Sequence, residues 1–147
     1  MQTIESVQVA NGLFAGTGTQ TRLIGTRCTS CGALYFPTAL SCRNPLCRDK
    51  RIEPARFGER GTLYSYTVQS YRPPPLFRMD DWAPYAIGLV ELPEGIRVMG
   101  MLTGVALDQI RIGMPLALTT EPLYTDEQGR AVLTYKFRPA PAEGDAL

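Results

Sequence analysis

Four cysteines are the residues of this chain best suited to chemistry, and they fall into two pairs. Cys28 and Cys31 are separated by two residues in CTSCG, Cys42 and Cys47 by four residues in CRNPLC, and ten residues lie between the pairs. A tight turn within each pair lets two thiolates converge on one metal ion, and Gly32 suits the backbone angles of such a turn. Four sulfur ligands leave no coordination position open. The spacing therefore predicts a structural zinc site, with one ion per chain that contributes folding free energy.

Two other uses of the four sulfurs stay open. A rubredoxin-type iron site also binds through four thiolates, although its symmetric C-x2-C pairs differ from the C-x4-C of the second pair here. Disulfide or redox use belongs to oxidising compartments. The amino terminus, MQTIESVQVANG, has neither the basic start nor the apolar run of a signal peptide, and no apolar stretch approaches the roughly 18 residues of a membrane span. We therefore expect a cytoplasmic protein, in which metal binding is favoured.

The chain contains no histidine. This excludes a Ser/His/Asp triad, a Cys/His nucleophile pair and a HExxH metal site, because each of them requires an imidazole. The net charge of +1, from fifteen basic and fourteen acidic residues, provides no broad field for binding nucleic acid or an anionic membrane. Partners must therefore be inferred from local patches and motifs.

Segments rich in β-branched and aromatic residues surround the cysteines and fill the second half of the chain. Around the cysteines, the strand-like segments are RLIGTR (22–27), ALYFP (33–37) and RIEPARF (51–57). Beyond them, strands are predicted at 61–71, 84–92, 96–104, 114–122 and 131–137. In the first of these five strands, Tyr64 and Tyr66 alternate onto one face, which we interpret as barrel core.

The connections between these five strands indicate the barrel type. Residues 93–95 form a short turn that predicts a hairpin, and residues 106–113 leave room for one helical turn between the third and fourth strands. This arrangement favours an OB-fold over an SH3-like barrel. The prediction is a mainly β protein with an N-terminal segment (1–21), a rubredoxin-like zinc ribbon (22–57), a five-stranded OB-fold barrel (58–138) and a flexible tail (139–147).

Two sets of residues are candidates for contact with a ligand or partner. The connection RPPPLFRMDDWA (72–83) is longer than a barrel needs, and its apolar residues either cap the open end of the barrel or contact a ligand or partner. The other set lies at the second cysteine pair, where it either binds a phosphate or an acidic partner, or forms a solvated face that balances the thiolate charge. It consists of Arg43, Arg48, Lys50 and Arg51.

Several motifs together resemble a known family, the zinc-ribbon/OB-fold acyl-CoA-associated proteins. They are the CxxCG knuckle followed by Tyr35, Phe36 and Pro37, the second cysteine pair, GTLYSYTV at the start of the barrel and IRIGMPL before its fourth strand. The similarity runs from about residue 22 to 137, and CRNPLC departs from the CxxC that is commoner at the second pair.

The resemblance implies a non-catalytic accessory subunit of a thiolase-superfamily enzyme, bound to a thiolase-like catalytic subunit in a hetero-oligomer. The ligand of that complex would be a coenzyme A thioester, and its reaction would be the thiolytic cleavage of a 3-oxoacyl-CoA, with an aromatic one such as benzoylsuccinyl-CoA among the expected substrates. Thiolytic cleavage uses a thiolate and an acid/base group, commonly a histidine. With all four sulfurs on metal this chain has no spare cysteine, and it has no histidine, so no catalytic residue is predicted in it.

Within such a complex, the long connection would cover the acyl-CoA entrance of the catalytic subunit. The residues predicted to contact acyl-CoA or the partner are Phe77, Arg78, Trp82, Tyr85, Arg43, Arg48 and Arg51. Two rival functions remain. A single-stranded nucleic-acid module would stack bases on Tyr64, Tyr66 and Tyr71, but the near-neutral charge disfavours it. A zinc-stabilised scaffold would bind proteins without touching substrate.

Overall fold

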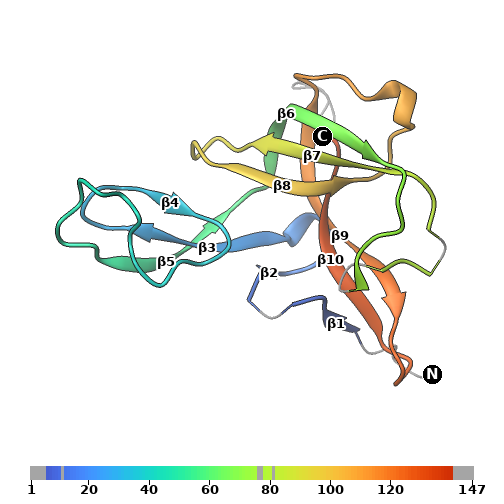
Figure 1. Ribbon diagram of the computed structural model, residues 1–147, viewed down its shortest axis with the longest axis horizontal. Coiled ribbons are helices and arrows are strands. Elements are labelled where there is room, and N and C mark those ends of the chain that lie inside the picture. Colours follow the sequence, from blue (N-terminus) through green and yellow to red (C-terminus); the bar gives the residue numbers. More distant parts are fainter. Residues whose placement is uncertain (1–5, 11, 76–77, 81, 141–147) are drawn as a thin grey trace.

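The computed structural model describes residues 6–10, 12–75, 78–80 and 82–140, and this part of the chain folds into two β-sheets. Figure 1 shows a slender sheet that projects from one side of a barrel. The barrel strands are β6 (Arg60–Gln69), β7 (Tyr85–Glu91), β8 (Arg97–Leu102), β9 (Pro115–Thr125) and β10 (Ala131–Pro139). The slender sheet, or ribbon, consists of β2 (Phe14–Ala15), β3 (Arg22–Cys28), β4 (Leu34–Tyr35) and β5 (Ile52–Phe57). The described residues include no helix long and apolar enough to cross a membrane.

The five barrel strands close on themselves. Hydrogen bonding follows the order β9, β6, β7, β8 and β10, and β10 then pairs with β9 to complete the circle. All of these pairs are antiparallel except β8 with β10. One short 3-10 helix, η3 (Leu107–Gln109), lies between β8 and β9, where the sequence predicts a helical turn. The prediction of an OB-fold following a zinc ribbon is therefore confirmed, and each of the five predicted barrel strands is present.

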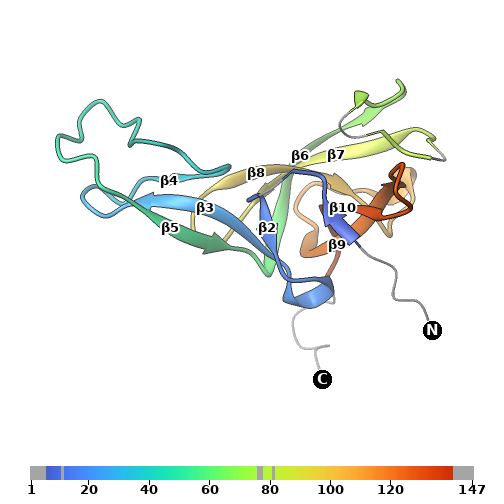
Figure 2. The same ribbon diagram turned by 90° about the horizontal axis from the view of Figure 1, so that it is seen from below.

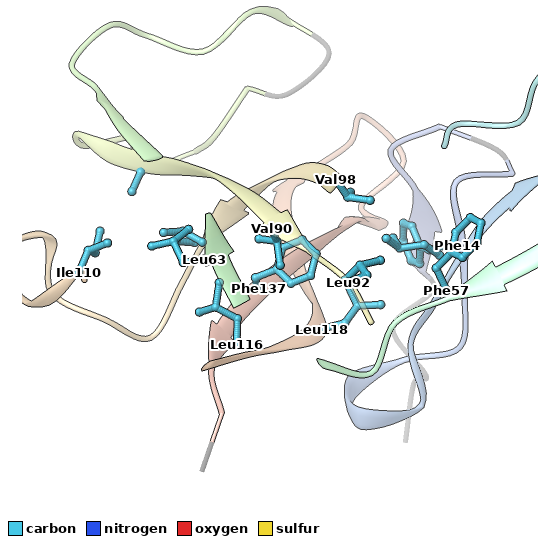
Figure 3. Packing of buried hydrophobic residues seen from close by; sticks show 13 residues of the cluster. Phe14, Phe57, Leu63, Val90, Leu92, Val98, Ile110, Leu116, Leu118 and Phe137 are labelled. Atoms are coloured by element: carbon cyan, nitrogen blue, oxygen red, sulfur yellow. The ribbon is translucent and has the colours of Figure 1, made fainter. Parts of the chain in front are cut away.

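The interior of the barrel is packed with large apolar side chains that alternate along the strands. Leu63 of β6 faces Val90 of β7, and both are at most 1% exposed. Figure 3 shows these residues meeting Phe137 of β10 at the centre of the barrel. A side chain at Gly100 would lie 2.8 Å from the Phe137 ring, so a glycine is needed for β8 to approach β10 this closely.

The interpretation of Tyr64 and Tyr66 as barrel core is wrong. Their side chains are 47% and 37% exposed. Because neighbouring residues in a strand point to opposite faces, the inward position of Leu63 places Tyr64 outside, where its ring lies 3.7 Å from the guanidinium carbon of Arg97. The pairing of β6 with β7 shifts its register between Leu63 and Ser65. The alternation of faces is interrupted there, so the face on which Tyr66 lies cannot be counted from Tyr64.

The N-terminal segment, for which the sequence predicts no function, connects the two sheets. Strand β1 (Ser6–Gln8) pairs in parallel with β10, and β2 pairs with β3. A 3-10 helix, η1 (Gly18–Gln20), leads from β2 into β3. Phe14 is 2% exposed and belongs to one hydrophobic cluster with Leu23 and Phe57 of the ribbon and Phe137 of the barrel. The base of the ribbon and the barrel therefore share a core, while the loops between β3 and β5 extend away from it (Figure 2).

Candidate metal centre and ligand-binding face

The four cysteines converge at the outer end of the ribbon. Cys28 ends β3, and the other three lie in the loops between β3 and β5. The Sγ atoms of Cys28 and Cys47 are 3.7 Å apart, those of Cys31 and Cys42 are 3.5 Å apart, and all four lie within 4.8 Å of one another. Tetrahedral Zn–S bonds of about 2.3 Å place neighbouring sulfurs about 3.8 Å apart. The four sulfurs are thus free thiols positioned to bind one metal ion, and none of them is joined in a disulfide.

Backbone and side-chain donors surround these sulfurs. The backbone N–H of Cys31 donates to Cys28, which is the main reason why the pKa of the Cys28 thiol is lowered to about 6. The backbone N–H of Lys50 donates to Cys47 at 3.4 Å, but burial and the neighbouring sulfurs outweigh it and raise the pKa of Cys47 to about 11. Two adjacent thiolates repel each other unless a cation lies between them. A metal ion would remove that repulsion, so metal binding and loss of the thiol protons are coupled.

Tyr35 supports the second cysteine pair. Its hydroxyl lies 3.4 Å from the Cys42 sulfur and accepts a hydrogen bond of 2.7 Å from the backbone N–H of Arg43. The hydrogen bond from Tyr35 is the largest cause of the lowered pKa of the Cys42 thiol. Tyr35 is therefore part of the metal centre, although the sequence reveals only an aromatic residue near the first knuckle. Groups of this kind orient metal ligands and adjust their basicity.

The arginines predicted around the second cysteine pair lie on the surface of the same loops. Arg43, Arg48 and Arg51 are all exposed. Arg43 extends over the Tyr35 ring, with 5.6 Å between its guanidinium carbon and the ring centre. The ion pairs formed by the described residues involve none of these arginines. They are thus brought together near the metal centre, far along the ribbon from the long connection (Figure 1).

The long connection between β6 and β7 consists of residues 70–84, and we call it the strap. Its described residues 78–80 lie against the β9–β10 hairpin. The Arg78 guanidinium carbon lies 4.1 Å from the centre of the Tyr124 ring. Asp80 accepts a hydrogen bond of 3.1 Å from the backbone N–H of Thr125. Met79 packs against the hydrophobic cluster that contains Leu123. The strap is therefore fastened at residues 78–80.

The other predicted strap residues have different environments. Trp82 is half-buried, and Tyr85, also half-buried, begins β7. Phe77 lies outside the described residues. The exposed guanidinium of Arg78 has its direction fixed by Tyr124, and Tyr85 lines the groove described below.

An apolar groove lies between the strap and the barrel. Its volume is about 270 Å³, and residues of β7, β8 and β10 line it together with Pro74 of the strap. The lining residues are Pro74, Tyr85, Ile87, Met99, Gly100, Met101, Thr134 and Tyr135. The Tyr135 hydroxyl donates to the carbonyl oxygen of Met99 at 2.6 Å, and burial raises the pKa of Tyr135 to about 12. Tyr85 is the groove residue that the sequence predicted as a contact. The others come from the strap, β7, β8 and β10 and share no local sequence pattern. This groove lies on the second and third barrel strands, the face on which OB-folds commonly bind ligands.

Known families match both parts of the chain. Residues 18–53 match the family described as the ChsH2 rubredoxin-like zinc ribbon domain, and residues 55–121 match the ChsH2 C-terminal OB-fold domain. A solved structure titled Ltp2-ChsH2(DUF35) aldolase is similar with a TM-score of 0.61 and 37% sequence identity, over 82% of this chain and 86% of that one. The ribbon followed by an OB-fold is thus a recurring arrangement.

Several curated relatives cover most of the chain. A DUF35 domain-containing scaffold protein of Methanocaldococcus jannaschii is 34% identical over 119 residues, which are 80% of this chain and 81% of the relative. The benzoylsuccinyl-CoA thiolase subunit BbsA of Thauera aromatica is 31% identical over 116 residues, 79% of this chain and 75% of the relative. A probable enoyl-CoA hydratase alpha subunit of Thermomonospora curvata is 37% identical over 108 residues, but these are only 32% of that protein. The chain therefore belongs to the DUF35 family of ChsH2-type proteins, which combine a rubredoxin-like zinc ribbon with an OB-fold domain.

Proposed function

We propose that this protein is a non-catalytic accessory subunit of a thiolase-like acyl-CoA enzyme in the cytoplasm. The observation that carries the proposal is the use of all four cysteines at one metal centre in a chain without histidine. Thiolytic cleavage of a 3-oxoacyl-CoA requires a thiolate nucleophile and an acid/base group. The catalytic groups would thus reside on a partner subunit. Relatives named as a thiolase subunit and as a scaffold protein support this division of roles.

The metal that we propose for the ribbon is zinc, bound by Cys28, Cys31, Cys42 and Cys47. The sulfur spacing fits a tetrahedral ion with a closed ligand shell. Such an ion would supply folding free energy to loops that bury few apolar side chains. A metal assay on the purified protein should find about one zinc per chain, and iron in its place would refute the assignment.

The strap and the groove beneath it are the proposed contact with acyl-CoA. A CoA thioester offers a long arm, an acyl group and phosphates, which fit extended, apolar and cationic surfaces respectively. The groove supplies the apolar surface, and Arg78 supplies a cation whose direction is fixed by Tyr124. We infer that Phe77, Arg78, Trp82 and Tyr85 cover the acyl-CoA entrance of the catalytic subunit. An aromatic 3-oxoacyl-CoA such as benzoylsuccinyl-CoA is the proposed substrate class.

The test uses the complex of this chain with the thiolase-like subunit from the same organism. Trp82→Ala should leave the complex assembled but raise the KM for acyl-CoA or lower the turnover, because the strap would lose its largest side chain. Leu107→Ala, which truncates an exposed side chain of η3, is the matched control. If the Trp82 variant assembled and turned over acyl-CoA like the wild type, the proposed contact with acyl-CoA would be refuted, and the strap would only cover the end of the barrel.

Co-purification also separates this function from its rivals. Stable association with a thiolase-like subunit supports the accessory role. Salt-sensitive binding to single-stranded oligonucleotides would instead favour a nucleic-acid module, for which Tyr64, Tyr66 and Tyr71 are sufficiently exposed. Stable binding to a protein without any effect on acyl-CoA kinetics would favour the scaffold.

A further inference from the structure

The outer end of the ribbon presents two leucines almost completely to solvent. Leu40 and Leu46 are 104% and 88% exposed, which are the largest values among the exposed large hydrophobic residues of the described chain. Leu40 lies two residues before Cys42, and Leu46 immediately precedes Cys47, so both flank the same metal centre. An isolated exposed leucine needs no explanation. Two of them in the single loop between β4 and β5, at the end of the molecule farthest from its core, give this loop two apolar side chains that a partner could bind.

Hydrogen bonds hold the loop around Leu46 in one conformation. Asn44 accepts from the backbone N–H of Leu46 through its side chain at 3.0 Å and from that of Cys47 through its carbonyl at 3.0 Å. The Lys50 ammonium donates to the carbonyl oxygens of Cys42 and Asn44 at 3.0 and 3.1 Å. Leu46 is therefore presented by a stiff turn, which cannot bury its side chain without breaking these bonds. A side chain presented in this way loses little conformational freedom when a partner binds it.

Leu40 is presented in a similar way by its neighbour. Ala39 is 5% exposed, and its backbone N–H donates to the buried Thr26 hydroxyl oxygen at 3.1 Å. This contact fixes the loop to β3 directly beside Leu40.

Four cations lie in the same loop as the two leucines. Residues 40–51 include four basic side chains and one acidic side chain, Asp49, a difference of +3. The proposed zinc centre, with four thiolates and one Zn2+, would carry −2, so this end of the ribbon keeps a positive balance of +1. Arg43, Arg48 and Arg51 are exposed and take no part in the ion pairs formed among the described residues. An apolar centre with a charged rim is the usual composition of a protein–protein interface. Its complement is an apolar pocket edged by carboxylates.

We propose that residues 40–51, the ribbon tip, insert Leu40 and Leu46 into an apolar pocket edged by carboxylates on the catalytic subunit. The inference rests on the proposed accessory function and adds a second contact, distant from the strap (Figure 1). It also gives the longer second knuckle a role. The C-x4-C loop has two residues more than a C-x2-C turn, and Leu46 belongs to this longer loop.

The experiment measures binding of the full-length, metal-loaded chain to the separately purified thiolase-like subunit by biolayer interferometry. Leu46→Ser and Leu40→Ser should each weaken binding about tenfold, mainly through faster dissociation. Arg43→Glu and Arg48→Glu should slow association and reduce its salt dependence, because rim charges steer the encounter. Ile112→Ser, which changes a side chain that is 67% exposed on the barrel, is the matched control and should bind like the wild type. All variants should retain the wild-type melting temperature, because the replaced leucines are exposed.

The possible outcomes separate this inference from the function on which it rests. A wild-type chain that does not bind the catalytic subunit would refute the proposed function and the ribbon-tip contact together. A stable wild-type complex that is insensitive to both leucine substitutions would refute the ribbon-tip contact alone. Weakening by Ile112→Ser equal to that by Leu46→Ser would also refute it, because the loss would then not be specific to the tip.

Discussion

The Tyr35 hydroxyl provides a direct test of how the ribbon supports its metal centre. This oxygen lies between two groups, the backbone N–H of Arg43 at 2.7 Å and the Cys42 sulfur at 3.4 Å. Tyr35→Phe removes the oxygen and preserves the ring, so the packing of the half-buried side chain changes little. The variant therefore tests the effect of this one hydroxyl group on the Cys42 sulfur.

The structure determines the direction and the size of the effect. The Tyr35 hydroxyl is the largest cause of the lowered pKa of Cys42, so its loss raises that pKa and makes the thiolate harder to form. Loss of a group that orients a metal ligand typically lowers metal affinity 10- to 100-fold. Because Arg43 is exposed, water can replace the hydroxyl at its backbone N–H, and we expect the lower end, about tenfold.

Competition with a colorimetric zinc chelator measures this effect. Protons compete with zinc for Cys42, and a higher thiol pKa strengthens that competition, so the pH at which half of the zinc is lost should move upward in Tyr35→Phe. Tyr71→Phe removes a hydroxyl from a tyrosine that is 78% exposed and serves as the control. Equal zinc affinity and equal pH dependence in wild type and Tyr35→Phe would show that the hydroxyl does not stabilise the Cys42 thiolate.

Three further changes have defined outcomes. Gly25→Ala would place a Cβ atom 2.2 Å from the carbonyl oxygen of Tyr35 and 2.4 Å from the Phe57 ring; thermal unfolding should show a loss of about 3 kcal/mol or more, because backbone cannot move aside cheaply. Phe14→Ala should reduce the free energy of unfolding in urea by about 3–5 kcal/mol, and a loss below about 1 kcal/mol would contradict the shared core. Removal of the metal by a chelator should broaden or shift the NMR signals of the ribbon loops but preserve those of the barrel, whose core residues lie outside the metal centre.

The cysteine spacing and the barrel strands could be predicted because each depends on local sequence. Two thiols separated by a tight turn can converge without any knowledge of the rest of the fold, and the five strands are recognisable from short apolar segments bounded by turns. Strands β1 and β2 could not be predicted in this way. They are three and two residues long, too short to show a pattern of their own. Strand β1 exists because β10, distant in sequence, offers it a partner, and β2 exists because β3 does.

The errors and omissions at the candidate site have related causes. Alternation along β6 divides its residues between two faces but does not show which face is buried. The sequence therefore did not reveal that Leu63 points into the core and Tyr64 points outward. The groove under the strap combines residues of β7, β8 and β10. Because no single segment of the sequence contains all of these residues, the groove could not be predicted from a local pattern. The fastening of the strap through Arg78 depends on Tyr124, which is 46 positions away along the chain and becomes a neighbour only through the fold.

The shared core at the base of the ribbon determines how the two proposed contacts can act together. Phe14 and Phe57 are each 2% exposed, and they pack in the same cluster as Phe137 of the barrel. The Arg22–Glu59 ion pair spans the junction between the ribbon and the barrel as well. Swinging the ribbon away from the barrel would expose these aromatic rings to water, at a cost of several kcal/mol. The ribbon tip and the strap are therefore held at a fixed separation. Two contacts on one rigid body reinforce each other only when the partner presents both surfaces at that spacing. If both proposed contacts form, an accessory subunit built in this way would select its catalytic partner by shape as well as by the chemistry of each contact.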